Sequence, residues 1–242
     1  MRAAIALHDS QLRAHQAELL LEGPHLLEEA VAAGVRVLRV FALEEDTAAA
    51  ALAKRVGAEL VLIQTHLLFR VSTVNSPQSP VAIATRPVRP PTAPAALVAW
   101  EINDPANLGS LARIAAGFGM DLLTQAGADP WGPKALRAGA GGQFRIGLEG
   151  IGSDGLEGLI ERGYQLVAAV PVGGDLPWQA KFGDRPAFVA GSEAHGLPEA
   201  VIRVAATRVS IPMPGGTESL NVAAAAAILG YEWLRSKRLP SP

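Results

Sequence analysis

The stretch that decides the fold is IPMPGGTESLNVAAAAAILGYEW, residues 211–233. A short apolar strand is predicted to run into a turn rich in proline and glycine, and an alanine-rich helix follows the turn. Ser219 stands where it can cap that helix, and the glycines allow the backbone to approach a bound molecule closely. The pattern is typical of a small-molecule pocket built from main-chain atoms. An ordinary strand–turn–helix junction is the alternative that this stretch alone leaves open.

A second informative segment lies upstream, NDPANLGSLARIAAGFGMD at residues 103–121. Its apolar residues recur at spacings of three and four, which predicts a helix that ends at Gly117 or Gly119. Asn107 and Arg113 fall outside this apolar set. We expect Asn107 at the start of the helix and Arg113 on its second turn, with both side chains directed at one crevice. A helix cap and a solvated arginine are the alternative.

The third segment is FVAGSEAHGLPEAV, residues 188–201. An apolar strand is predicted to end at Gly191, and Gly196 and Pro198 are predicted to open a further helix. Glu193 is an isolated acid between them, and its alternative role is to cap that helix. The segment lacks the ordered serine, acid and histidine of a hydrolase, so it does not indicate acyl transfer.

The composition is that of a globular protein. Of 242 residues, 49% are hydrophobic and 18% are charged, and no uncharged apolar run is long enough to predict a membrane span. The chain has no cysteine, which excludes disulfides and thiolate metal ligands. No secretory leader opens it, so we expect a cytoplasmic protein. A formal net charge of −2 argues against nonspecific binding of nucleic acid, and RNA binding would therefore need local basic patches.

Arginine and lysine residues gather in three places that offer such a patch. These are Arg86 with Arg89; Lys134 with Arg137 and Arg145; and Arg235 with Lys237 and Arg238. The last group also complements the dipole at the end of the final helix. The glycine cluster at 139–142 weakly resembles a dinucleotide-binding fingerprint, but no clear strand precedes it.

The chain divides at RPVRPPTAP, residues 86–94, which is predicted to be a stiff, extended linker. Before it, helices are predicted at about 24–33 and 47–57, and strands at 35–43 and 59–64. This alternation indicates a small α/β domain. We therefore expect a first domain at 1–85, a linker at 86–95 and a second domain at 96–242.

The three segments together resemble the SpoU or TrmH-type RNA 2'-O-ribose methyltransferases of the SPOUT superfamily. The resemblance rests on N-x-x-x-x-x-R from Asn107, G-x-E-x-x-G-L from Gly191 and I-P-M-x-G-x-x-x-S-L-N-V from Ile211. It implies an α/β fold in which the second domain has a trefoil-knotted parallel sheet. The LLEG run at 20–23 and the segment at 78–82 resemble the L30e-like substrate-binding domain that precedes many such domains.

The resemblance also implies a homodimer, and it marks two departures. Gly139 stands where the family has a serine, and the segment before the LLEG run is short and lacks the usual basic residues. The alanine-rich helix allows another helix to pack closely against it, and the resemblance places this helix near the dimer interface.

The activity implied by the resemblance is methyl transfer from S-adenosylmethionine to a ribose 2'-hydroxyl, in ribosomal RNA rather than transfer RNA, without a metal. Backbone contacts to the cofactor are expected from Gly191, Ile211 and Leu220, and pocket walls from Pro212 and Met213. The polar ring near ribose and phosphate is expected to comprise Asn107, Arg113, Glu193, Ser219 and Asn221.

The role of Arg113 has more than one interpretation. A free arginine stays protonated, so we prefer that it holds a phosphate and stabilises the developing alkoxide rather than acting as a base. A noncatalytic RNA-binding relative and a nicotinamide-dependent enzyme are the other two hypotheses for the chain. Binding of S-adenosylmethionine or of a dinucleotide discriminates among them.

Overall fold

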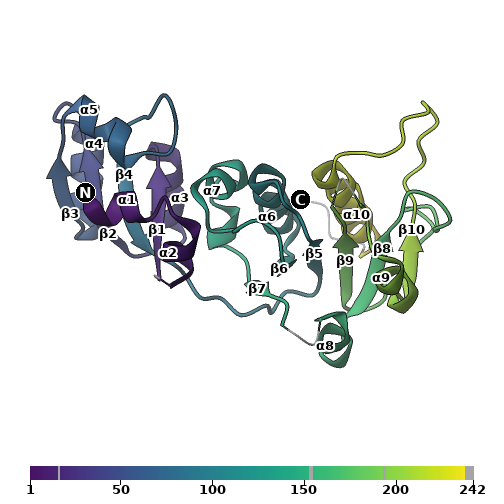
Figure 1. Ribbon diagram of the computed structural model, residues 1–242. Coiled ribbons are helices and arrows are strands. Elements are labelled where there is room, and N and C mark those ends of the chain that lie inside the picture. The colour runs from purple at the N-terminus through teal and green to yellow at the C-terminus, as the bar shows by residue number, and fades with distance from the viewer. Residues whose placement is uncertain (16, 153–154, 193–194, 238–242) are drawn as a thin grey trace.

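The computed structural model describes residues 1–15, 17–152, 155–192 and 195–237. The two domains lie side by side, and each is built around its own sheet (Figure 1). Helices α6 and α7 lie between the N-terminal sheet and the strands at the far end of the C-terminal domain. None of the described helices is long and apolar enough to cross a membrane.

The N-terminal domain has a mixed sheet with strand order β1-β4-β2-β3. Strand β4 is antiparallel to β1 and β2, and β2 is parallel to β3. The elements are α1 (Arg2–Ala6), α2 (Ser10–His15), β1 (Glu18–Glu22), α3 (Pro24–Ala32), β2 (Val37–Ala42), α4 (Thr47–Val56), β3 (Glu59–Leu62), α5 (Thr65–Val71) and β4 (Val81–Thr85). The predicted helices and strands of this region are confirmed. The short helices α1 and α2 had no signal in the sequence pattern.

The C-terminal domain has a six-stranded parallel sheet with strand order β10-β8-β9-β5-β6-β7. Its elements are β5 (Ala96–Trp100), α6 (Pro105–Phe118), β6 (Asp121–Gln125), α7 (Pro133–Gly139), the 3-10 helix η1 (Gly142–Phe144), β7 (Leu148–Gly150), α8 (Gly155–Glu161), β8 (Gln165–Ala169), β9 (Pro186–Ala190), α9 (Glu199–Val204), β10 (Thr207–Val209) and α10 (Val222–Ser236). Because the strands are parallel, the loops that follow them emerge at one edge of the sheet.

Alternate residues of β5 face two different cores. Leu97 packs with α6 and α10 on one face of the sheet, and Val98 packs with α8 and α9 on the other. Helix α6 ends at Gly119, which adopts the left-handed conformation with φ 66° and ψ 37°. This confirms the second of the two predicted helix ends, because glycine reaches positive φ without steric cost.

The strand predicted to enter the 211–221 turn ends earlier than expected. Strand β10 stops at Val209 and pairs with β8 through only three residues. Pro212 and Pro214 have no backbone N–H to donate, so the chain beyond Ser210 cannot extend the ladder. The prediction of a strand at Ile211 was therefore wrong, and Ile211 belongs to the loop.

The two domains share apolar packing as well as a linker. Trp131, Leu136 and Phe144 of the C-terminal domain belong to the same buried cluster as Leu21 and Leu27 of the N-terminal domain. The α/β class, the parallel sheet and the smaller preceding domain are confirmed, and the trefoil knot stays a prediction.

Candidate active site

A cavity of about 480 Å³ lies at the carboxyl edge of β8, β9 and β10. This volume suits a small-molecule ligand. Apolar residues make up most of its wall, together with a few polar ones. The lining residues are Ala169, Val170, Pro171, Ala190, Gly191, Ser192, His195, Gly196, Leu197, Ile202, Val209, Ile211, Met213, Glu218, Ser219, Leu220, Val222 and Ala225.

Four of the five predicted cofactor contacts line this cavity, namely Gly191, Ile211, Met213 and Leu220. Pro212 is not among the lining residues and is exposed. Successive side chains of an extended segment point in opposite directions, so Ile211 and Met213 share a side that Pro212 does not. The loop after β8, the loop after β9 and the 211–220 loop thus line one cavity together.

Gly191 is required by a close approach between two parts of the cavity wall. A Cβ at Gly191 would overlap the carbonyl of Gly196 and lie 2.7 Å from the backbone nitrogen of Leu197. Contacts this short are not seen for real side chains. The residue after β9 therefore has to be glycine for the backbone of Gly196 and Leu197 to lie this close to it.

The helix cap of α10 is Asn221, not Ser219. The Oδ1 of Asn221 accepts a hydrogen bond of 2.9 Å from the backbone N–H of Ala223. Because α10 begins at Val222, Ser219 lies too early in the chain to cap it. The predicted cap was wrong, and Ser219 instead lines the cavity.

Asn221 also joins α10 to α6. Its Nδ2 donates a hydrogen bond of 3.0 Å to Oδ1 of Asn107, which lies 114 residues earlier in the chain. Asn107 is on the first turn of α6, where Asp104 rather than Asn107 is the cap. The structure thus brings together two of the predicted polar residues at the start of two neighbouring helices.

Replacing Asn221 with alanine is expected to lower both stability and cofactor affinity. Loss of a helix cap costs about 0.5–2 kcal/mol, and loss of the bond to Asn107 frees the loop that lines the cavity. Thermal unfolding and titration calorimetry with S-adenosylmethionine measure the two effects. Asp46→Ala is the matched control, since Asp46 caps α4 in the other domain. If both variants bind the cofactor equally well, Asn221 acts only as a helix cap and does not support the cofactor site.

Arg113 lies away from the cavity. It is exposed on α6 and does not line the cavity, and within the described ranges it makes no hydrogen bond or ion pair. Residues six apart on a helix differ by about 120° in direction. Arg113 and Asn107 therefore do not share one face of α6, and their convergence on one crevice of this chain is not observed.

The remaining predicted residue, Glu193, lies outside the described residues. Sequence reasoning did not select Ser192, His195 or Glu218, although all three line the cavity. Ser192 and Glu218 each lie directly beside a predicted site residue, and that position was the available signal, whereas His195 has no predicted site residue as an immediate neighbour.

The predicted basic patch around Lys134 is neutralised. Lys134 donates to Asp104 at 2.8 Å and Arg145 donates to Glu29 at 2.7 Å, while Arg137 pairs with Glu22. Each cation thus has a carboxylate partner, so this region does not present a surplus of positive charge. In the last group Arg235 pairs with Glu232, and Arg238 lies outside the described residues.

Two of these ion pairs lower the pKa of their carboxylates. The hydrogen bond from Lys134, followed by the bond from the backbone N–H of Ala106, lowers the pKa of Asp104. The hydrogen bond from Arg145 lowers the pKa of Glu29. Both carboxylates are therefore charged at neutral pH and hold their cations in place.

Gly139, where the family has a serine, is matched by an unusual neighbour. Gln143 is fully buried, and its Nε2 donates to the carbonyl oxygens of Ala135 at 2.9 Å and Pro130 at 3.3 Å. A Cβ at Gly139 would overlap Oε1 of Gln143 and lie 2.7 Å from its Cδ. The amide of Gln143 thus occupies the space that a side chain at 139 would need.

Fold and cavity together define a two-domain α/β protein with a small-molecule site at the carboxyl edge of a parallel sheet. The SpoU rRNA methylase family matches residues 94–231, and the MRM3-like substrate binding domain matches residues 1–82. The chain therefore belongs to the SpoU rRNA methylase family.

Several relatives are similar over nearly the whole chain. An uncharacterized tRNA/rRNA methyltransferase of Synechocystis is 35% identical, over 96% of this chain and 89% of the relative. The 23S rRNA (guanosine(2553)-2'-O)-methyltransferase RlmP of Bacillus subtilis is 29% identical, over 93% and 92%. Among solved structures, the SpoU methyltransferase AviRb from Streptomyces viridochromogenes, in complex with the cofactor AdoMet, superposes with a TM-score of 0.87 at 26% identity, covering 98% of this chain and 97% of AviRb.

Proposed function

We propose that the protein transfers the methyl group of S-adenosylmethionine to a ribose 2'-hydroxyl of ribosomal RNA. The observation that carries the proposal is the largely apolar cavity formed by the loops after β8, β9 and β10, in a chain that matches the SpoU family. RlmP, by its name, methylates such a hydroxyl in 23S rRNA, and AviRb holds AdoMet.

The residues of the cavity fit this cofactor. The missing side chain of Gly191 lets the backbone of Gly196 and Leu197 pack against it in the cavity wall, and Ile211, Met213 and Leu220 offer apolar surface. Glu218 and Ser219 add polar atoms on the same loop. When bound, the cofactor supplies an activated methyl on a sulfonium centre, so the chain has only to align donor and acceptor and to manage one proton.

Arg113 serves as the phosphate-binding and alkoxide-stabilising group in this proposal. An exposed arginine without a carboxylate partner in the described ranges is available to an RNA phosphate. Asn107, Glu193, Ser219 and Asn221 complete the polar ring. Because Arg113 lies outside the cavity of its own chain, the ring is completed only when RNA or a second copy of the chain approaches α6.

We also propose that the chain forms a homodimer. Tyr231 on α10 is 57% exposed, beside a run of alanines that allows close helix packing. Light scattering of the purified chain measures its mass, and a monomer at micromolar concentration would contradict this part.

The N-terminal domain is proposed to bind the RNA, consistent with its match to a substrate-binding domain. We place the domains at 1–85 and 96–242 with a linker at 86–95, since β4 ends at Thr85 and β5 begins at Ala96. The proposed site of action is the cytoplasm.

The test is methyl transfer from labelled S-adenosylmethionine to ribosomal and transfer RNA, followed by digestion to nucleosides. A labelled 2'-O-methylnucleoside from ribosomal RNA is the expected product. Label on transfer RNA alone would make transfer RNA, the alternative substrate, the target of the enzyme, and label on a base would contradict ribose chemistry. Failure to bind S-adenosylmethionine would favour a noncatalytic RNA-binding protein, and binding of a nicotinamide dinucleotide instead would overturn the methyltransferase assignment.

A further inference from the structure

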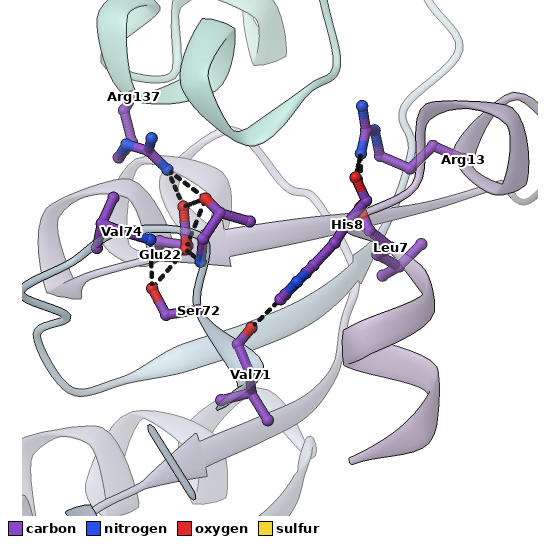
Figure 2. Close-up of polar contacts among 9 residues, drawn as sticks. Leu7, His8, Arg13, Glu22, Val71, Ser72, Val74 and Arg137 are labelled. Carbon is purple, nitrogen blue, oxygen red and sulfur yellow. Dashed lines mark hydrogen bonds and ion pairs between the residues drawn. The ribbon is translucent and has the colours of Figure 1, made fainter. Parts of the chain in front are cut away.

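Glu22, the last residue of β1, is a buried carboxylate at the contact between the two domains (Figure 2). It accepts hydrogen bonds from Oγ of Ser72 at 2.6 Å and from the backbone N–H of Thr73 at 2.6 Å. The hydroxyl of Thr73 donates to the other carboxylate oxygen at 2.9 Å. These donors all belong to the N-terminal domain, and they fix the carboxylate before any contact with the second domain.

The cation that balances Glu22 comes from the other domain. Arg137 extends from α7 to the carboxylate, and its guanidinium also donates to Oγ1 of Thr73 at 3.1 Å (Figure 2). Burial lowers the pKa of Arg137, but arginine stays charged at neutral pH. A buried carboxylate is costly without a partner, so this pair strongly favours one position of α7 against the N-terminal domain.

Helix α7 is in turn packed directly on the backbone of α6. A Cβ at Gly109 of α6 would overlap the carbonyl of Ala135 and lie 2.8 Å from Cβ of Ala138 in α7. A Cβ at Gly142 of η1 would lie 3.0 Å from Cα of Arg113. Two glycines thus bring α7 and η1 into backbone contact with the turn that carries Arg113. In a close-packed interior, α7 cannot shift without moving that turn.

We propose that Glu22 is a positioning residue: by holding Arg137 it fixes α7 and η1, and through them the α6 turns that carry Asn107 and Arg113. The docking of the RNA-binding domain is thereby coupled to the geometry of the site. The kinetic part of this inference rests on the proposed function, whereas the structural part does not.

A second ion pair across the same contact provides the matched control. Glu29 and Arg145 are joined at 2.7 Å, but their side chains are 29% and 50% exposed, and Arg145 is not on α7. Exposed pairs of this kind contribute little. Glu29→Gln removes the same type of charge from the same contact without disturbing a buried network.

The experiment compares Glu22→Gln, Arg137→Met, Arg137→Lys and Glu29→Gln in the full chain. Amide hydrogen exchange is followed in α6, in α7 and, as an internal reference, in β5 and β9. Steady-state transfer to RNA and cofactor affinity are measured on the same samples. Arg137→Met is included because it leaves the bonds of Glu22 within its own domain in place.

Glu22→Gln and Arg137→Met are each expected to speed exchange in α7 and in the middle of α6 by about tenfold to 100-fold, since a charged hydrogen bond of this kind is worth about 1.5–3 kcal/mol. The rate constant at saturating RNA is expected to fall by about the same factor, while the dissociation constant of S-adenosylmethionine stays within about twofold. Arg137→Lys is expected to show smaller changes in the exchange rate and in the rate constant than Arg137→Met. Glu29→Gln is expected to leave both quantities at their wild-type values.

Unchanged exchange in α6 when that of α7 rises would overturn the coupling. A rise in KM for RNA with an unchanged rate constant would overturn the positioning role and leave Glu22 as a docking residue only. If the wild-type chain methylates no RNA, the proposed function fails, and the exchange measurement alone decides the coupling.

Discussion

Replacement of Arg113 with alanine will abolish methyl transfer and leave the affinity for S-adenosylmethionine within about twofold of wild type. Removal of one group that stabilises developing charge costs about 100- to 1,000-fold in rate. Arg113 is exposed on α6 and lines no part of the cavity, so its loss leaves the cofactor contacts intact. Single-turnover transfer to ribosomal RNA and titration calorimetry measure the two quantities on one preparation.

Arg203→Ala is the matched control for this variant. Arg203 is also an exposed arginine on a helix, but α9 packs on the opposite face of the sheet from α6. Arg203→Ala should transfer methyl groups at the wild-type rate. Parallel loss of transfer and of cofactor affinity in Arg113→Ala would instead show that Arg113 supports the fold.

Replacement of Gly191 with alanine is expected to weaken cofactor binding by about tenfold to 100-fold, because forcing an extra methyl group into a closed packing costs about 1–3 kcal/mol. The added Cβ would overlap the carbonyl of Gly196, so Gly196 and Leu197 have to move from their places in the cavity wall. Methyl transfer at low cofactor concentration should fall in proportion. Equilibrium binding of the cofactor checks the first effect directly.

Gly150→Ala distinguishes this effect from a general sensitivity of the sheet. Gly150 also ends a strand of the same sheet, yet a Cβ there would meet nothing within 4 Å. Its cofactor affinity should therefore match the wild type. Tight cofactor binding by Gly191→Ala would mean that Gly196 and Leu197 can move without harm to the site. The close approach of Gly191 to these two residues would then not be needed for cofactor binding.

The sequence pattern predicted those features of the structure that depend on neighbouring residues in the chain. The three- and four-residue spacing of Leu108, Leu111 and Ala115 placed the buried face of α6, and all three are buried. The glycine and proline residues after the strands marked the loops that line the cavity. In both cases the signal lies within a few residues of the structure that it specifies.

What the sequence did not reveal depends on partners far along the chain. Arg137 reads as a surface cation until Glu22, 115 residues earlier, is placed against it. The choice of Asn221 over Ser219 as the cap depends on where α10 begins, which a run of alanines does not define. The direction of Arg113 relative to Asn107 is different, because a spacing of six residues already fixes an angle of about 120° on any α-helix. The prediction that both side chains face one crevice did not take this angle into account.

The buried amide of Gln143 makes the residue types allowed at 139 and 143 depend on each other. A side chain at 139 forces Gln143 to move from its bonds to Ala135 and Pro130. The effects of changes at the two positions are therefore expected not to add, and Gly139→Ser should be tolerated better in a chain that also carries a shorter residue at 143.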